Sequence, residues 1–152
     1  MPLPVLTIAQ MRDWEKATWA AGQTEAEVIR KVGRAVADLA LRRTSPGDLI
    51  LILAGPGNNG ADARAAREHL AERRIDLLDV TEPGTEFPKL EARLSLKPRL
   101  VIDALFGIGL NRPLSAEWIR FIERVNEAQL PVLAVDVPSG LNADTGQKYG
   151  AA

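Results

Sequence analysis

The stretch LILAGPGNNGADARAAREHL, residues 51–70, changes character twice. It begins inside a continuous apolar run, DLILILA at 48–54, which has the length of a strand covered on both faces. A loop of Gly, Pro and Asn follows, and the segment 61–73, rich in Ala, Arg and Glu, is predicted to be a helix. A strand, a Gly-rich loop and a helix in this order favour an α/β protein, and the helix N-terminus is a potential phosphate site.

The segments around this stretch alternate between strand and helix patterns. Capping boxes begin predicted helices at 7–22 (Thr7 and Gln10) and at 24–43 (Thr24 and Glu27). Such alternation predicts a parallel sheet with right-handed crossovers. Further strands are expected at 75–80, 100–107 and 131–136, a loop at 81–88, a short helix at 88–96, and a helix at 115–129 with Trp118, Ile119, Ile122 and Val125 facing inward.

Composition restricts the class of protein. The 152 residues suit one domain, and a net charge of −1 gives no basic field for nucleic acid or anionic membrane. Without Cys there are no disulfides, thiolate metal sites or cysteine nucleophiles. No apolar run approaches the roughly 20 residues that span a bilayer, and the start of the chain lacks the pattern of a secretory signal. We therefore expect a cytoplasmic protein.

Three polar loops follow predicted strands and should share one edge of the sheet. Open parallel sheets bind ligands outside the carboxyl ends of their strands. Carboxylates at the ends of buried strands are costly unless they are paired, hydrogen-bonded or metal-bound. The loops carry Asn58, Asn59 and Asp62; then Asp103, Gly107, Gly109, Asn111 and Arg112; then Asp136, Pro138, Ser139, Gly140 and Asn142.

Other interpretations of these loops are weaker. Each loop alone could simply cap a helix or turn the chain. GPGNNG is neither a Walker loop nor a G-x-G-x-x-G motif, and PSG with the single His69 makes no serine triad. Asp79 and Glu82 are weak ribose-binding candidates for a generic dinucleotide oxidoreductase. The three Trp residues, Trp14, Trp19 and Trp118, are expected to pack against the protein.

The segments AGPGNNGADA, VIDALFGIGLNRP and AVDVPSGLNADTG together resemble the YjeF N-terminal domain family, the NAD(P)HX epimerases. The resemblance spans nearly all of the chain. It implies a Rossmann-like three-layer αβα fold with a central, mainly parallel sheet, and commonly a dimer. It implies interconversion of the R and S hydrates of NADH and NADPH, with a fused or separate dehydratase restoring the cofactor.

The same resemblance implies site residues. A potassium ion would be held by Asn59, Asp103 and Ser139. Asp136 would be the best candidate for proton transfer. The substrate-binding residues would be Asn58, Asn59, Gly60, Ala61, Asp62, Gly107, Ile108, Gly109, Leu110, Asn111, Arg112, Pro113 and Asp136.

This sequence also departs from the family pattern. Ala61 and Ala63 replace two glycines of the first motif, and Ile108 stands where many members have Thr. Members usually continue beyond the equivalent of GQKYGAA, so we expect residues 1–152 to be one domain, incomplete at its C-terminal end, with helices in 1–44. These departures keep a non-catalytic nucleotide-binding or scaffold domain as the alternative function.

Overall fold

The structure is a computed structural model that describes residues 5–152. Residues 1–4 lie outside the described residues. They belong to the N-terminal region 1–44 that was expected to hold helices, and to the start of the chain that lacks a secretory signal pattern. The elements in chain order are α1 (Ile8–Ala20), α2 (Glu25–Leu41), β1 (Leu49–Ala54), α3 (Asn58–Ala66), the 3-10 turn η1 (Arg67–His69), β2 (Arg74–Asp79), α4 (Pro83–Ser95), β3 (Leu100–Ala104), α5 (Ala116–Glu127) and β4 (Val132–Ala134).

The four strands form one all-parallel sheet in the order β2-β1-β3-β4. The expected Rossmann-like arrangement is confirmed, with β1 in the interior of the sheet between β2 and β3. Its residues from Ile50 to Ala54 are all buried, as the continuous apolar run predicts. Because all strands run in the same direction, the loops after β1, β3 and β4 lie at one edge.

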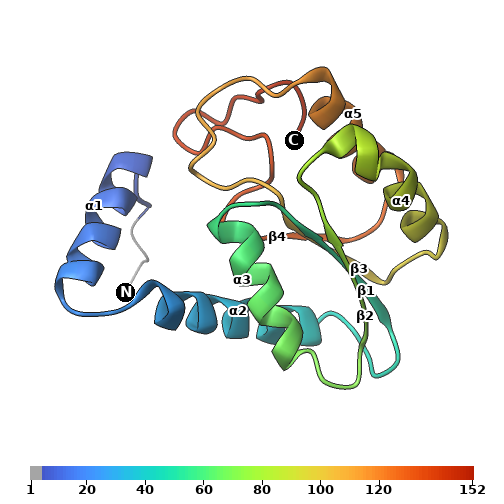
Figure 1. Cartoon of the computed structure of the whole chain (residues 1–152), viewed down its shortest axis with the longest axis horizontal. Helices are drawn as coiled ribbons and strands as arrows, with labels where there is room; N and C mark the ends of the chain where they lie inside the picture. The colour runs from blue at the N-terminus through green and yellow to red at the C-terminus, as the bar shows by residue number, and fades with distance from the viewer. Residues whose placement is uncertain (1–4) are drawn as a thin grey trace.

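Helices cover both faces of the sheet, giving three layers (Figure 1). On one face α2 and α3 pack through small residues, among them Ala37 and Ala63, against Ile50 and Ile52. On the other face α4 and α5 pack against Leu51 and Leu53. Alternate residues of β1 thus serve opposite cores. Within residues 5–152, no helix is long and apolar enough to cross a membrane.

The caps explain where several helices begin. Both predicted capping boxes are present, at Thr7 with Gln10 and at Thr24 with Glu27. The Ser115 hydroxyl accepts a hydrogen bond from the Trp118 amide at the start of α5. On α5, Ile122 and Val125 are buried as predicted. Trp118 and Ile119 are only partly buried, and the fully buried Phe121 was not predicted.

Some predicted boundaries are wrong. Helix α3 begins at Asn58 and not at 61, and it ends at Ala66 before a 3-10 turn. The predicted loop 81–88 is mostly helix, because α4 begins at Pro83. Pro is favourable at the first helical position, since it lacks an N–H that would have no partner there. Strand β4 is shorter than the predicted 131–136.

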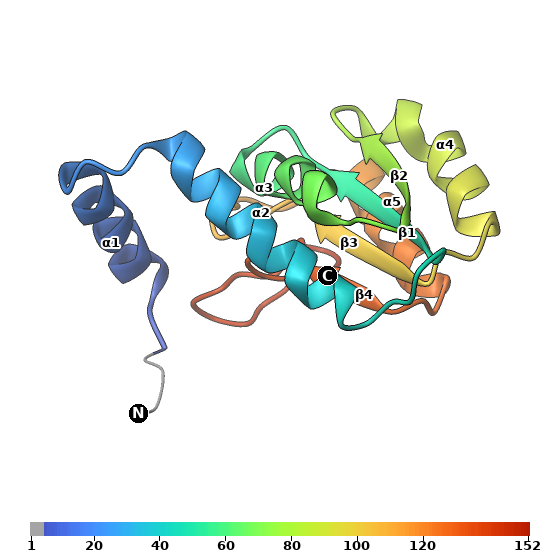
Figure 2. The ribbon, with the colours of Figure 1, turned by 90° about the horizontal axis from the view of Figure 1, so that it is seen from below.

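The first helix differs most from expectation in its packing. Helix α1 stands apart from the sheet and its covering helices in two perpendicular views (Figures 1 and 2). It has no buried residue, and Trp14 and Trp19 are 59% and 39% exposed. The prediction that all three Trp residues pack against the protein is therefore wrong for these two. Trp118 does pack, edge-on against Phe106.

Candidate functional site

The loop after β1 leads into an open helix N-terminus. Gly57 is the N-cap of α3, and its carbonyl accepts the hydrogen bond from the Ala61 amide. The first turn of a helix leaves its amides without intrahelical partners, which suits an anion. These amides belong to residues 58–60, so the open helix N-terminus lies earlier than the helix predicted from position 61.

Two glycines allow the backbone of this loop to lie close to its neighbours. A side chain at Gly60 would place its Cβ 1.8 Å from the Gly55 carbonyl oxygen. A Cβ at Gly55 would lie 2.2 Å from the carbonyl oxygen of Leu105, in the loop after β3. Both distances are too short for any larger residue. Gly55 therefore allows direct contact between the first and second loops, and Gly60 allows the start of α3 to lie against Gly55.

Ser139 ties the second loop to the third through Asp103. The Asp103 Oδ1 accepts a hydrogen bond from the Ser139 hydroxyl (2.6 Å), and its Oδ2 accepts one from the Ser139 amide (2.9 Å). The Ser139 hydroxyl in turn accepts a bond from the Phe106 amide at 2.9 Å. Burial raises the pKa of the Asp103 carboxyl, and the hydrogen bonds from Ser139 and the Leu105 amide offset part of this rise.

Asp136 faces both other loops. Its Oδ2 accepts a hydrogen bond from the Ile108 amide at 2.8 Å, and its backbone has the left-handed φ of 72°. The Asn59 side-chain amide donates to the Val135 carbonyl at 2.8 Å. A Cβ on Gly107 would lie 2.5 Å from Asp136 Oδ2 and 2.6 Å from Asn59 Oδ1. All three predicted loops therefore meet around Gly107.

Asp62 adds a second carboxyl to this group. It lies on the first turns of α3 and is partly buried. Partial burial raises the pKa of Asp62 to about 6, and the nearby Asp136 carboxylate adds to the rise. A carboxyl with such a pKa carries a proton in part of the molecules near neutral pH, which is the property that proton-transfer groups need.

The remaining predicted substrate residues extend from this centre. Leu110 is partly buried against the core of α4 and α5. Gly109, Asn111, Arg112 and Pro113 are exposed on the loop between β3 and α5. They share the loop of Gly107 and Ile108, so they form an accessible margin of the site and not its buried part.

The alanines of the first motif fit the helix without strain. Ala61 and Ala63 both lie within α3, and neither has a positive φ. Ala63 is fully buried in the core between α3 and the sheet. Its methyl group therefore faces that core and not the loops at the carboxyl edge of the sheet. Neither substitution argues against ligand binding.

The donor set suits a hard monovalent cation. Asp103, Ser139 and Asn59 supply carboxylate, hydroxyl and amide oxygens, and the Phe106 carbonyl lies 3.3 Å from the Ser139 hydroxyl. Within residues 5–152, no cluster of three His, Cys, Asp or Glu side chains suits a transition metal. Oxygen ligands with a single carboxylate match the chemistry of an alkali cation. The residues present therefore fit potassium.

Several contributing groups had no sequence signal. The Val135 carbonyl orients Asn59, and the Phe106 amide orients Ser139. Both are main-chain groups, which any residue type could supply. Gly107 was predicted as a ligand contact, but its role at the junction of the loops follows only from the folded geometry.

Comparison with known proteins places this geometry in a family. The model of the YjeF-related protein N-terminus matches residues 25–93 and 78–152. The chain belongs to the YjeF N-terminal family. The three motifs that suggested it are the loops that meet around Gly107 in this YjeF N-terminal domain.

Relatives extend the comparison. An NAD(P)H-hydrate epimerase of Achromobacter xylosoxidans is 39% identical over 97% of this chain and 78% of its own length. One from Bordetella pertussis is 41% identical over 81% of this chain and 61% of its own. The bifunctional NAD(P)H-hydrate repair enzyme Nnr of Corynebacterium glutamicum is 34% identical, and the match covers 29% of it. This YjeF N-terminal domain thus spans about four fifths of the Achromobacter epimerase and about three fifths of the Bordetella one.

A methyl group at Gly107 should disable the site without unfolding the protein. In Gly107→Ala the new Cβ must displace the Asp136 carboxylate or the Asn59 amide, each less than 3 Å away. We expect catalytic turnover to fall by about 10-fold or more, because misplacing reacting groups by about 1 Å can cost 100-fold. The measurement is kcat together with the thermal unfolding temperature. Gly84→Ala on α4, which meets only the Glu117 side chain at 3.3 Å, is the control, and equal losses in both variants would contradict the assignment.

The pKa of Asp62 predicts a pH-dependent stability difference. Because the folded-state pKa is raised from 3.8 to about 6, the folded protein holds a proton that the unfolded chain releases. Wild-type stability attributable to Asp62 therefore falls as pH rises from about 4 to 6, and it stays lower above that. Asp62→Asn should be increasingly stabilised relative to wild type across this window. Urea unfolding of both proteins at pH 4, 5, 6 and 7 tests this, and a constant difference would refute it.

Proposed function

We propose that this chain is an NAD(P)H-hydrate epimerase, an isomerase that interconverts the R and S hydrates of NADH and NADPH. The main structural support is that three separate loops meet beside the open N-terminus of α3, through Asn59, Gly107 and Asp136. The relatives named above are described by this epimerase or repair activity, and they give no support to a scaffold role.

In this proposal the substrate lies across the carboxyl edge of the sheet. A phosphate of the dinucleotide would accept hydrogen bonds from the amides of residues 58–60, where the helix dipole also favours negative charge. The hydrated nicotinamide ring would lie beside Asp136, whose carboxylate is held by the Ile108 amide. The exposed residues 109–113 would contact the rest of the dinucleotide.

The carboxyl groups would then move the proton. Inversion of a carbon that carries a hydroxyl group requires one of its bonds to break and to re-form on the other face. If the C–O bond breaks, Asp136 protonates the departing oxygen and takes a proton back from the water that adds to the opposite face. Asp62, with its pKa near 6, is a neighbouring carboxyl that can supply the proton that Asp136 carries at the start of a turnover.

A potassium ion held by Asn59, Asp103 and Ser139 belongs to the same proposal. It would supply positive charge that offsets the cost of the buried Asp103 carboxylate and attracts the phosphates of the substrate. Hydrogen bonds from Ser139 to Asp103 hold the second and third loops together, so the ion would bind at this junction of the loops.

The proposal also includes partners and a location. We expect a homodimer in which the exposed face of α1, with Trp14 and Trp19, is covered by a second copy. A fused or separate dehydratase would consume the S hydrate, and a bifunctional relative supports this pairing of activities. The location would be the cytoplasm, where the reduced cofactors are used.

Titration with oxidised NADP, observed by amide NMR, tests the binding part of this proposal. We expect shifts in residues 55–62 and 104–113, because these loops form the proposed site. Saturable binding with no shift at these residues would contradict it.

A further inference from the structure

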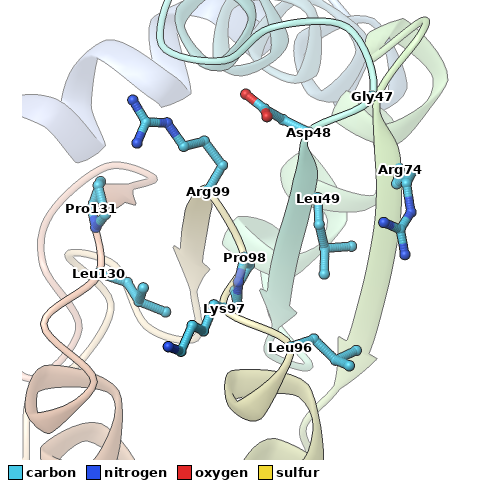
Figure 3. A pocket seen from close by; sticks show the side chains of 10 residues that line it. All are labelled: Gly47, Asp48, Leu49, Arg74, Leu96, Lys97, Pro98, Arg99, Leu130 and Pro131. Carbon is cyan, nitrogen blue, oxygen red and sulfur yellow. The ribbon is translucent and has the colours of Figure 1, made fainter.

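A second hollow lies at the opposite, amino edge of the sheet. Its volume is about 570 Å³, within the range of small-molecule sites. It is formed where the chain enters β1, β2, β3 and β4, and Figure 3 shows Arg74, Lys97 and Arg99 arranged around it. Its remaining lining residues are Gly47, Asp48, Leu49, Leu96, Pro98, Leu130 and Pro131. None of them belongs to the proposed substrate site.

The charge of this amino-edge hollow is positive on a chain that is slightly acidic overall. Arg74, Lys97 and Arg99 are exposed, and none forms a salt bridge within the described residues 5–152. Asp48 is the one acid in the lining, and its Oδ2 already accepts a hydrogen bond from the Ser45 amide at 2.7 Å. Arg74 begins β2, and Lys97 and Arg99 lie on the segment that enters β3, so all three cations belong to the lining of this hollow.

Lys97 occupies a backbone position that usually favours glycine. It follows the end of α4 with a left-handed φ of 51°, and its amide donates to the Leu94 carbonyl. Glycine is the common residue at such a helix end, because a Cβ is strained there. The dipole of α4 also favours a cation at this end. A substitution of Lys97 therefore changes the stability of the fold whether or not its side chain binds a ligand. Only a change in ligand affinity would show that the Lys97 side chain has a binding role.

We propose that the amino-edge hollow binds a small molecule that carries two or more phosphate groups. The cations come from two strand entrances, those of β2 and β3, so a ligand with several negative charges would contact more of them than a single phosphate would. Leu96, Leu130 and Pro131 supply apolar surface for an organic part such as a nucleoside. This site is independent of the epimerase proposal, because it lies at the other edge of the sheet.

The test uses ATP, inorganic pyrophosphate and adenosine as probes in low salt. We expect ATP and pyrophosphate to shift the amide signals of Gly47, Lys97 and Arg99 and to bind more weakly at high salt. Tighter binding of ATP would assign contacts to the nucleoside, and equal binding would assign recognition to the phosphates alone. The proposal is overturned if neither anion shifts these signals, or if adenosine binds as well as ATP.

Variants decide whether these cations cause the binding. Lys97→Gly should raise the unfolding temperature yet weaken ATP binding by about threefold. The double variant Arg74→Gln with Arg99→Gln should weaken ATP binding by about 10-fold. Both losses are on the scale of exposed charge pairs. Arg30→Gln, an exposed charge on α2, is the matched control. Unchanged ATP affinity in both cation variants would overturn the site, even if Lys97→Gly is stabilised.

Discussion

Asp136→Asn is expected to lower the rate of R-to-S epimerisation by about 100-fold or more, the usual scale for losing an acid–base group. The substitution keeps the shape of the side chain and removes its charge and its titratable proton. Asn also tolerates the left-handed backbone that position 136 adopts at φ 72°. Its amide oxygen can still accept the hydrogen bond from Ile108, so the fold should be retained.

The comparison needs a carboxylate outside the site. Asp38→Asn removes an exposed carboxylate from α2 and should leave the rate unchanged. The unfolding temperatures of both variants should lie close to that of wild type. If Asp136→Asn is folded and epimerises as fast as wild type, Asp136 has no part in proton transfer.

Ser139→Ala is expected to destabilise the protein by about 2–3 kcal/mol, because it leaves buried polar groups without partners. The Ser139 hydroxyl donates to Asp103 and accepts from the Phe106 amide, and Ser139 itself is only 2% exposed. Alanine leaves Asp103 with fewer donors and the Phe106 amide without this acceptor. Urea unfolding measures the loss. Ser95→Ala, on the exposed end of α4, should cost less than about 0.5 kcal/mol.

The same variant tests the ion. We expect potassium to raise the unfolding temperature of wild type relative to a bulky organic cation at equal ionic strength, because an ion that binds only the folded state stabilises it. Ser139→Ala should lose most of this effect. An identical potassium effect in wild type and variant would exclude Ser139 from the ion site.

The architecture was predictable because its signals are local. Continuous apolar runs marked the buried strands, and Thr7 and Thr24 marked two helix starts through side chains only three residues away. The common edge of the three loops followed from the parallel direction of the strands. These predictions depend on periodicity and capping, which a single sequence displays directly.

Features that depend on tertiary contacts were not predictable. The exposure of Trp14 and Trp19 depends on where α1 stands relative to the remaining layers, which helix periodicity does not encode. The early start of α3 and the burial of Ala63 depend on packing against α2 and the sheet. The orientation of Asn59 and Ser139 depends on main-chain groups of Val135 and Phe106.

The most direct test of the epimerase proposal is to add the purified protein to the separated R hydrate of NADPH and to follow the appearance of the S hydrate by chromatography. We expect the mixture to approach the same R-to-S ratio from either pure form, far faster than without protein. The Asp136→Asn variant at the same concentration should show about 1% of the rate or less. If the folded wild-type protein binds oxidised NADP at residues 55–62 but does not accelerate interconversion from either form, it is a nucleotide-binding domain and not an epimerase.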